Sequence, residues 1–224
     1  MDDLLRDIAR ARIGATFNQY AGRDGAVRLA NLERYLAERS GADVVALGEA
    51  AGYQGMRWSG IAFTSERDLM RWGPPYRTTS DRQGGWSEPS GTIVHRVLGE
   101  LAAERRVVLW NTVPHHPHRP GEPLSNRRPS VAEIEIGSEF ALRAIELLRP
   151  GRVVAVGRIA EGILGEGAHY VRHPANGGGA AFAAGMAAEL AALDLDPVTD
   201  GTATPVPGTS VASEHHSRRR RDPS

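Results

Sequence analysis

Short apolar runs alternate along this chain with segments whose apolar residues recur at helical spacing. Buried strands are predicted at residues 44–48, 107–110, 153–156 and 170–171. Helices are predicted at residues 2–14, 25–40, 90–105, 130–148 and 182–193, with a short one beginning near residue 158. Strands that alternate with helices favour a mostly parallel sheet covered on both faces. The pattern therefore predicts an α/β fold, a three-layer α/β/α sandwich with a central four-stranded sheet.

Two segments fall outside this alternation. Residues 50–89 are rich in Gly, Pro, Arg and Trp, and a loop of that length inside a compact domain is usually functional. From residue 196 onward the chain is mostly Pro, Thr, Gly and Ser and includes a run of arginines at 218–221. We expect one domain over residues 1–195 and a disordered, arginine-ending tail over 196–224. The arginine run either holds nucleic acid loosely or is simply solvated.

Composition excludes several kinds of chemistry. All 27 basic residues are arginine, which removes a Walker phosphate loop and lysine Schiff-base catalysis. The absence of cysteine removes disulfides, thiolate nucleophiles, iron–sulfur clusters and cysteine zinc sites. No run is long and apolar enough to span a membrane, and the acidic N-terminus lacks the features of a secretory signal. We therefore expect a soluble, cytoplasmic protein.

Polar side chains stand at the ends of three predicted strands. Glu49 follows the first, Asn111 the second and His173 the last. Loops that leave the carboxyl ends of parallel strands share one edge of the sheet, and ligands bind there. An asparagine amide can pair with the edge of a base, Phe63 can stack on its face, and a histidine can donate to a developing oxyanion. Together these residues are parts for binding and cleaving at a nucleobase.

Four motifs in the right order make the sequence resemble the uracil-DNA glycosylase superfamily. Gly48-Glu49-Ala50-Ala51-Gly52 corresponds to the water-activating motif, and Gly60-Ile61-Ala62-Phe63-Thr64 to the segment with a stacking phenylalanine. Asn111 with Pro114 corresponds to the uracil-reading segment, and His173-Pro174 to the second catalytic motif. Residues 153–158 resemble the strand between the last two, and the resemblance covers residues 42–193. Bacterial members with a Gly-Glu-Ala-Pro-Gly motif, and the iron–sulfur members, are the nearest comparison.

The chain departs from those members in two respects, and from the superfamily's best-known branch in one more. Without cysteine it cannot hold their cluster, and Ala51 replaces the usual proline, which predicts a less rigid loop. Ala50 stands where the best-known branch has an aspartate. Either Glu49 supplies that function or backbone carbonyls position the water.

The resemblance implies a DNA repair enzyme that hydrolyses the N-glycosidic bond of deoxyuridine, in single- or double-stranded DNA at the bacterial nucleoid. It is expected to leave an unbroken abasic strand and to act as a monomer without cofactor or metal. The expected catalytic residues are His173 and Glu49. The residues expected to bind substrate are Phe63, Asn111, Gly48, Ala50 and Tyr53. The residues expected to contact DNA are Arg127, Arg128, Arg172, Gly177 and Gly178.

Two other function classes stay open at this point. A relative that binds or captures uracil-containing DNA without turnover would fit Ala51 and the missing aspartate. A nucleotide- or methyl-donor-binding enzyme would use residues 48–55 as a dinucleotide loop, although the glycine spacing there is poor.

Several individual residues also have alternative interpretations. His115, His116 and His118 are interpreted as loop residues lining the DNA side rather than metal ligands. Arg57, Arg67 and Arg71 belong either to a solvated face or to a DNA contact. Gly52 is small where a bulky side chain would exclude the 5-methyl group of thymine. Either Tyr53 fills that space, or the pocket admits thymine, hypoxanthine or xanthine.

Overall fold

Four parallel strands form the central sheet, in the order β3-β2-β5-β6. In the computed structural model, which describes residues 1–195, they are β2 (Val44–Ala50), β3 (Val107–Val113), β5 (Arg152–Val156) and β6 (His169–Val171). Every residue of β3 is buried, as are the first five of β2. This is expected of strands covered on both faces. The predicted three-layer α/β/α fold is confirmed.

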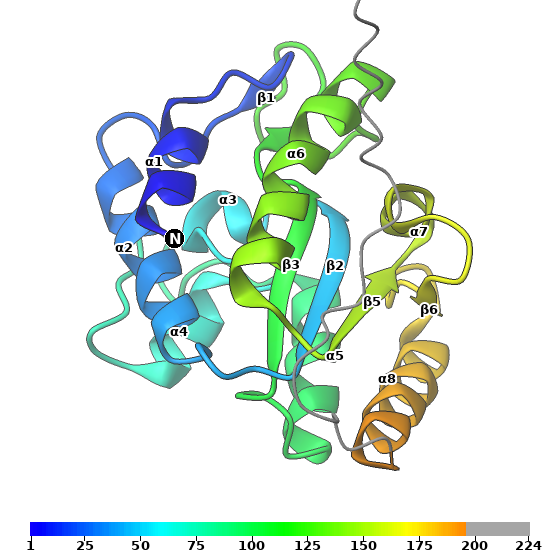
Figure 1. The fold of residues 1–224 in the computed structure, drawn as a ribbon. Helices are drawn as coiled ribbons and strands as arrows, with labels where there is room; N and C mark the ends of the chain where they lie inside the picture. The colour runs from blue at the N-terminus through cyan, green and yellow to red at the C-terminus, as the bar shows by residue number, and fades with distance from the viewer. Residues whose placement is uncertain (196–224) are drawn as a thin grey trace, which may run out of the picture.

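Helices cover both faces of this sheet, with α6 in front of it and α5 behind it in Figure 1. The helices flanking the strands are α1 (Asp2–Arg10), α2 (Gly25–Ala37), α5 (Pro89–Glu100), α6 (Val131–Leu148), α7 (Arg158–Leu164) and α8 (Gly179–Leu195). The α6 helix packs on β3, α8 packs on β6, and α5 contacts α8. No helix within residues 1–195 has the length and apolarity needed to cross a membrane.

The topology makes β2 the strand at which the chain reverses direction across the sheet. From β2 the chain passes through α5 to β3 at one edge, then returns through α6 to β5 on the other side of β2. Right-handed crossovers running in opposite directions place their helices on opposite faces. The loop leaving β2 therefore diverges from the loops leaving β3 and β5, and such a divergence opens a crevice at the carboxyl ends of the strands.

The strands are longer than predicted. β2 continues to Ala50 and β3 to Val113, so Glu49 and Asn111 lie within strands rather than after them. Gly48 pairs with Asn111, and Ala50 pairs with Val113. This additional strand pairing includes Gly48, Ala50 and Asn111, and it fixes the positions of their backbones.

The segment 50–89, predicted to be irregular, contains two short helices, α3 (Met56–Ser59) and α4 (Glu66–Trp72). A capping box between Ser65 and Asp68 starts α4. The buried carboxylate of Glu66 then accepts hydrogen bonds from the backbone N–H groups of Thr79 (2.7 Å) and Trp86 (3.1 Å). One buried acid thus fixes the part of the loop that local pattern leaves unspecified.

A second feature without a sequence signal is a two-stranded antiparallel sheet. It pairs β1 (Thr16–Phe17) with β4 (His116–Pro117). Strands of two residues are too short to show an alternating pattern. The predicted tail at 196–224 lies outside the described residues.

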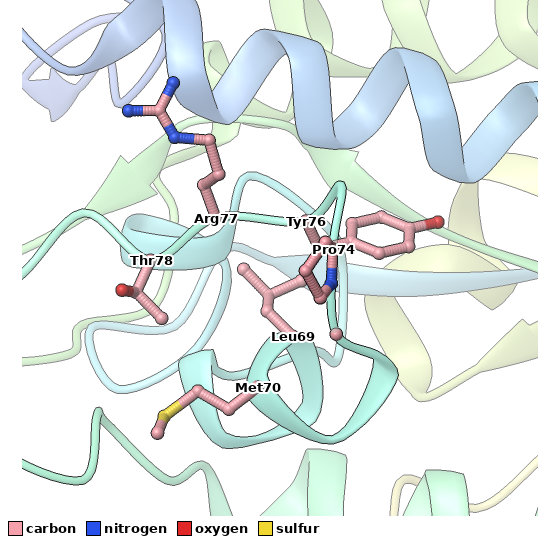
Figure 2. A pocket seen from close by; sticks show the side chains of 7 residues that line it. Leu69, Met70, Pro74, Tyr76, Arg77 and Thr78 are labelled. Atoms are coloured by element: carbon pink, nitrogen blue, oxygen red, sulfur yellow. The ribbon is translucent and has the colours of Figure 1, made fainter.

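A shallow pocket lies between α4 and the segment after it (Figure 2). Leu69 of α4 lies beside Pro74 in this pocket, while the side chains of Met70 and Arg77 point away from Pro74. None of the residues expected to bind substrate or DNA lines this pocket. Its largely apolar lining offers little that could orient a polar base.

One buried hydroxyl secures the outer edge of β3, and its removal is the first prediction. The Tyr35 hydroxyl of α2 accepts a hydrogen bond from the Leu109 N–H at 2.9 Å, and the tyrosine is fully buried. Tyr35→Phe leaves this N–H without a partner, so we expect the free energy of unfolding to fall by about 1–3 kcal/mol. Urea denaturation measures it. Tyr76→Phe, which removes a hydroxyl from a more exposed bond to Glu38, is the control, and equal losses would contradict the assignment.

Candidate active site

Gly48 is the point at which the candidate substrate-binding groups meet. A Cβ built on Gly48 would lie 2.5 Å from Asn111 Oδ1 and would also collide with the ring of Phe63. Real Cβ atoms do not come this close to other atoms, so the position accepts only glycine. The amide and the phenyl ring approach each other directly over the end of β2.

Asn111 presents a fixed amide in this site. The residue is 3% exposed, and its Nδ2 donates a hydrogen bond to Met56 Sδ at 3.2 Å. Its orientation follows from this contact, because a thioether sulfur accepts but does not donate. Oδ1 and the second N–H of Nδ2 make no other hydrogen bond within residues 1–195. Asn111 therefore offers an acceptor and a donor side by side, as expected.

Phe63 is held in an unusual backbone conformation. Its φ angle is +51°, in the left-handed region that non-glycine residues rarely adopt, which costs on the order of 1–3 kcal/mol. Ser59 fixes the turn by accepting the Ile61 N–H at 3.0 Å and donating its hydroxyl to the carbonyl of Thr64 at 2.6 Å. The ring of Phe63 lies 5.5 Å from that of His173, centroid to centroid. The loops after β2 and β6 therefore meet at one site.

His173 has one defined hydrogen bond and a lowered pKa. Burial lowers the pKa of the imidazole below its usual 6.5, and the carboxylate of Glu49 acts in the opposite direction. The ring is therefore neutral near pH 7. Its Nδ1 accepts the N–H of Ala175 at 3.2 Å, so the proton of the neutral ring resides on Nε2. His173 thus keeps one N–H to donate to a substrate oxygen.

Glu49 lies over the start of α7. A Cβ built on Gly157 would lie 2.7 Å from Glu49 Oε1, and Gly157 has a φ of +100°. Only glycine satisfies both the conformation and the space. The carboxylate is half-buried and close enough to His173 for its charge to act on that ring. It stands where a carboxylate can orient water beside a bound ligand.

The loop after Glu49 is braced despite its missing proline. Ala51 is buried, and its carbonyl oxygen lies 2.8 Å from His116 Nδ1. Burial lowers the pKa of His116 to about 4, so the ring is neutral and donates from Nδ1 to that carbonyl. A distant histidine thus supplies the restraint that Ala51 itself does not.

The interpretation of the histidine run as a DNA-facing loop is wrong for two of its members. His115 and His116 are completely buried, whereas His118 is partly exposed. His115 Nε2 lies 3.0 Å from the carbonyl oxygen of Ile8, and burial lowers its pKa to about 4. Within residues 1–195 no cluster of three or more His, Asp or Glu side chains is placed to hold a metal ion. These two histidines contact backbone carbonyls inside the protein, those of Ile8 and Ala51.

Arg127 does not have the freedom expected of a phosphate contact. Its guanidinium donates to the carboxylate of Glu133 twice, both at 2.7 Å. It also donates to the carbonyl oxygens of His118, Arg128 and Ala15. These five bonds use all five N–H groups of a guanidinium. Sequence reasoning assigned Arg127 to DNA, whereas the structure uses it to join loops.

The other expected DNA-contacting residues lie at the surface or beside it. Arg128, Arg172 and Gly177 are exposed, and Arg172 reaches the Asn176 carbonyl only at 3.4 Å. Gly178 is buried, and its N–H donates to the Ala175 carbonyl at 3.0 Å. Its backbone supports the loop rather than facing outward.

The arginines of the 50–89 segment divide into two groups. Arg57 is buried, and its guanidinium lies 3.9 Å from the centre of the Phe17 ring. Arg67 and Arg71 are exposed, and Arg71 pairs with Asp68 at 3.4 Å. A solvated face describes the last two, whereas Arg57 packs inside.

A groove runs beside the site, between the loops after β2 and β6. It is lined by Gln54, Glu88, Pro89, Ser90, Ile93, Asn126, Pro174, Ala175, Asn176, Gly177 and Gly179. The backbone N–H of Tyr53 donates to Asn126 Oδ1 at 3.0 Å, while the Tyr53 ring packs edge-on against Trp86. Sequence reasoning did not select Glu88, because an acid before a proline at a helix start resembles an ordinary cap.

Comparison with known proteins agrees with this geometry. The model of the Uracil DNA glycosylase superfamily matches residues 37–224. The chain belongs to this superfamily. Its members are DNA glycosylases, which are hydrolases that act on DNA, and the nucleotide- and methyl-donor-binding alternative is thereby disfavoured.

A solved structure shows the same fold. The crystal structure of wild-type Pedobacter heparinus SMUG2 is similar, with a TM-score of 0.63 and 14% sequence identity. The match covers 87% of this chain and 97% of that one. A search of curated protein sequences gave no significant match. At this level of sequence identity, the structural match shows the fold of this chain and carries no conclusion about base specificity.

The space at Gly48 can be tested without any substrate. In Gly48→Ala the new methyl group must displace the Phe63 ring or the Asn111 amide. We expect the free energy of unfolding to fall by about 1–3 kcal/mol, as overpacking does. Gly41→Ala is the control because nothing lies within 4 Å of its Cβ position. Denaturant titration compares the two, and equal stability would show that the site yields without cost.

Proposed function

We propose that this protein excises uracil from DNA by hydrolysing the bond between the base and the deoxyribose. The observation that carries the proposal is the convergence of Phe63, Asn111 and His173 around Gly48. A stacking ring, a paired donor and acceptor, and a neutral imidazole N–H are together complementary to a uracil leaving as an anion. The proposal rests on this geometry and on membership of the superfamily.

Recognition begins when the target nucleotide leaves the DNA stack. Flipping costs roughly a few kcal/mol and costs least in mismatched or single-stranded DNA. Phe63 then stacks on the base. Asn111 Oδ1 accepts the N3–H of uracil, and its free Nδ2–H donates to O4. Cytosine presents the opposite pattern at these two positions, so the amide distinguishes the two bases.

Bond cleavage separates a positive charge on the sugar from a negative charge on the base. His173 donates its Nε2–H to O2 of the departing uracil anion, and a neutral donor is sufficient for this task. Water near Glu49 attacks the oxocarbenium-like sugar carbon, and the carboxylate stabilises that cation. The attacking water gives up one proton and the uracil anion takes up one, so the products are neutral free uracil and an abasic site.

DNA contacts are proposed on both sides of the groove. Arg128 precedes α6 and Arg172 precedes the 174–179 loop, and both are exposed cations beside the groove. They would hold phosphates without reading sequence. Gly177, at the exposed tip of the loop, would approach the gap left by the flipped base. Arg127 has no part in this proposal because its donors are already used.

The absence of lysine makes the proposed enzyme monofunctional. Strand cleavage by a bifunctional glycosylase uses an amine that forms a Schiff base with the sugar. No side chain in this sequence supplies one. The abasic strand is therefore expected to stay intact until alkali or another enzyme cuts it.

The test of this function is release of uracil from single- and double-stranded oligonucleotides. His173→Ala is expected to lower kcat by roughly 100- to 1000-fold, the usual loss of an oxyanion donor. His169→Ala is the matched control, since that residue lies on β6 and pairs with Glu189. Near-normal activity of His173→Ala would refute the role. Tight binding of uracil-containing DNA with no released base would favour the capture protein instead.

The pH dependence gives a further readout of the same residue. Wild-type activity should fall on the acid side as His173 gains a second proton, because the imidazolium then opens the Ala175 contact. Since burial lowers the His173 pKa, the midpoint of this loss should lie below the usual 6.5. A pH–rate profile measures it.

Base reading is tested separately through Asn111. Asn111→Asp replaces the donor to O4 by an acceptor, so the preference for uracil over cytosine should fall by roughly 10- to 100-fold. Asn126→Asp, an exposed groove residue that keeps its acceptor for Tyr53, serves as the control. Competition between uracil and cytosine oligonucleotides gives the ratio, and an unchanged ratio would count against direct reading by Asn111.

A further inference from the structure

Glu88 is the acidic residue among those that line the groove, and the proposed mechanism does not use it. It directly precedes α5, but its side chain makes no capping hydrogen bond to that helix. The carboxyl group turns instead toward the loop after β2. There Glu88 Oε1 is the atom nearest to the Cβ position of Gly52, and Cδ lies 2.5 Å from that of Gly55. The carboxyl thus occupies the space that a side chain at residue 52 would need.

Within residues 1–195 the carboxyl of Glu88 has no hydrogen-bond partner. Oε2 is buried without a hydrogen bond, and Oε1 also has none but borders the groove. A buried carboxylate without a partner is costly, and burial raises the pKa of Glu88 to about 7. The negative charge of Asp68 on α4 adds to this rise. Such an acid is retained at a cost that the fold itself does not explain.

No cation in the described part of the chain acts on this charge. The segment 174–179 across the groove carries no ionisable side chain. Tyr53 turns its ring toward Trp86, and His173 packs its ring against Phe63. Asp68 is therefore the charged group that acts on Glu88 within residues 1–195.

The position of Glu88 relative to a bound base follows from the site, and this step rests on the proposed function. Around the ring of uracil the order of atoms is O2, N3, O4 and C5. His173 serves O2, and Asn111 serves N3 through Oδ1 and O4 through Nδ2. Since Nδ2 also contacts Met56, which follows Gly55, the next ring position faces the 52–56 loop. C5 is that position.

Glu88 also borders the residue that stacks on the base. A Cβ on Gly91 would lie 3.0 Å from the backbone carbon of Phe63 and 3.2 Å from Glu88 Oε2. The first turn of α5 therefore brings the carboxyl and the base-stacking segment together. Tyr53, the residue expected to fill this space, packs its ring against Trp86 instead.

We infer that Glu88 is a specificity-determining residue, whose carboxyl group across Gly52 rejects pyrimidines that carry a 5-methyl group. A methyl group placed there would strip water from the carboxyl without offering it a hydrogen bond. Uracil, with only a hydrogen at C5, leaves that water in place. Glu88, at the start of α5, thus excludes the 5-methyl group in the way that a bulky side chain at position 52 of the loop would.

This assignment has a pH signature that a merely structural role would lack. Desolvating a charged carboxylate costs more than desolvating a neutral carboxyl. Rejection of thymine should therefore strengthen as pH rises through about 7, where Glu88 loses its proton. The isosteric Glu88→Gln variant cannot ionise, so its discrimination should not change with pH in this way.

The experiment compares kcat/KM for single-stranded oligonucleotides that carry uracil or thymine at one position. Wild type, Glu88→Ala, Glu88→Gln and Glu100→Ala are assayed at about pH 6 and about pH 8, either side of the titration. Glu100, an exposed acid near the other end of α5, is the matched control. In Glu88→Ala the ratio of kcat/KM for uracil to kcat/KM for thymine should fall by roughly tenfold or more, the usual discrimination that one methyl group provides. Wild type should discriminate more strongly at the higher pH.

An unchanged ratio in Glu88→Ala, with uracil still released, would overturn this inference and leave the proposed function intact. If no protein releases any base, the proposed function fails, and the dissociation constants of the same oligonucleotides decide. A smaller ratio of the dissociation constants for thymine and uracil oligonucleotides in Glu88→Ala than in wild type would then support the inference. An identical ratio in the two proteins would overturn it.

Discussion

The site depends on a glycine near the end of a central strand. Gly48 lies near the end of β2, and the connections from β2 to β3 and from β3 to β5 run on opposite faces of the sheet. The Phe63 ring and the Asn111 amide occupy the space of its missing Cβ. Because the sheet fixes the backbones of Gly48 and Asn111, this contact sets the distance between the Phe63 ring and the Asn111 amide.

The loops around this point are held by buried polar groups rather than by regular structure. Glu66 accepts the backbone N–H groups of the 79–86 segment, and Glu133 joins Arg127 to the Ala15 N–H. His116 braces the carbonyl of Ala51. Each group satisfies donors or acceptors that would otherwise be buried without partners. The long loops can therefore carry a site with defined geometry.

Within this framework the site divides into satisfied and unsatisfied groups. His173 has its Nδ1 satisfied by Ala175, which leaves one N–H for a ligand, and Asn111 likewise keeps half of its amide free. Within residues 1–195 neither oxygen of Glu88 has a hydrogen-bond partner. These three residues therefore keep polar atoms that the rest of the described protein does not use.

The sequence alone determined the strands, the main helices and the order of the site motifs, because each is written in local periodicity or in adjacent residues. Strand-end positions sufficed to select Glu49, Asn111 and His173. Only the tertiary structure decided which polar groups are already used. Arg127 is consumed by Glu133 and distant carbonyls, His115 is buried against Ile8, and Glu88 turns toward Gly52. Those outcomes depend on partners far away in the chain, and no local pattern specifies such a meeting.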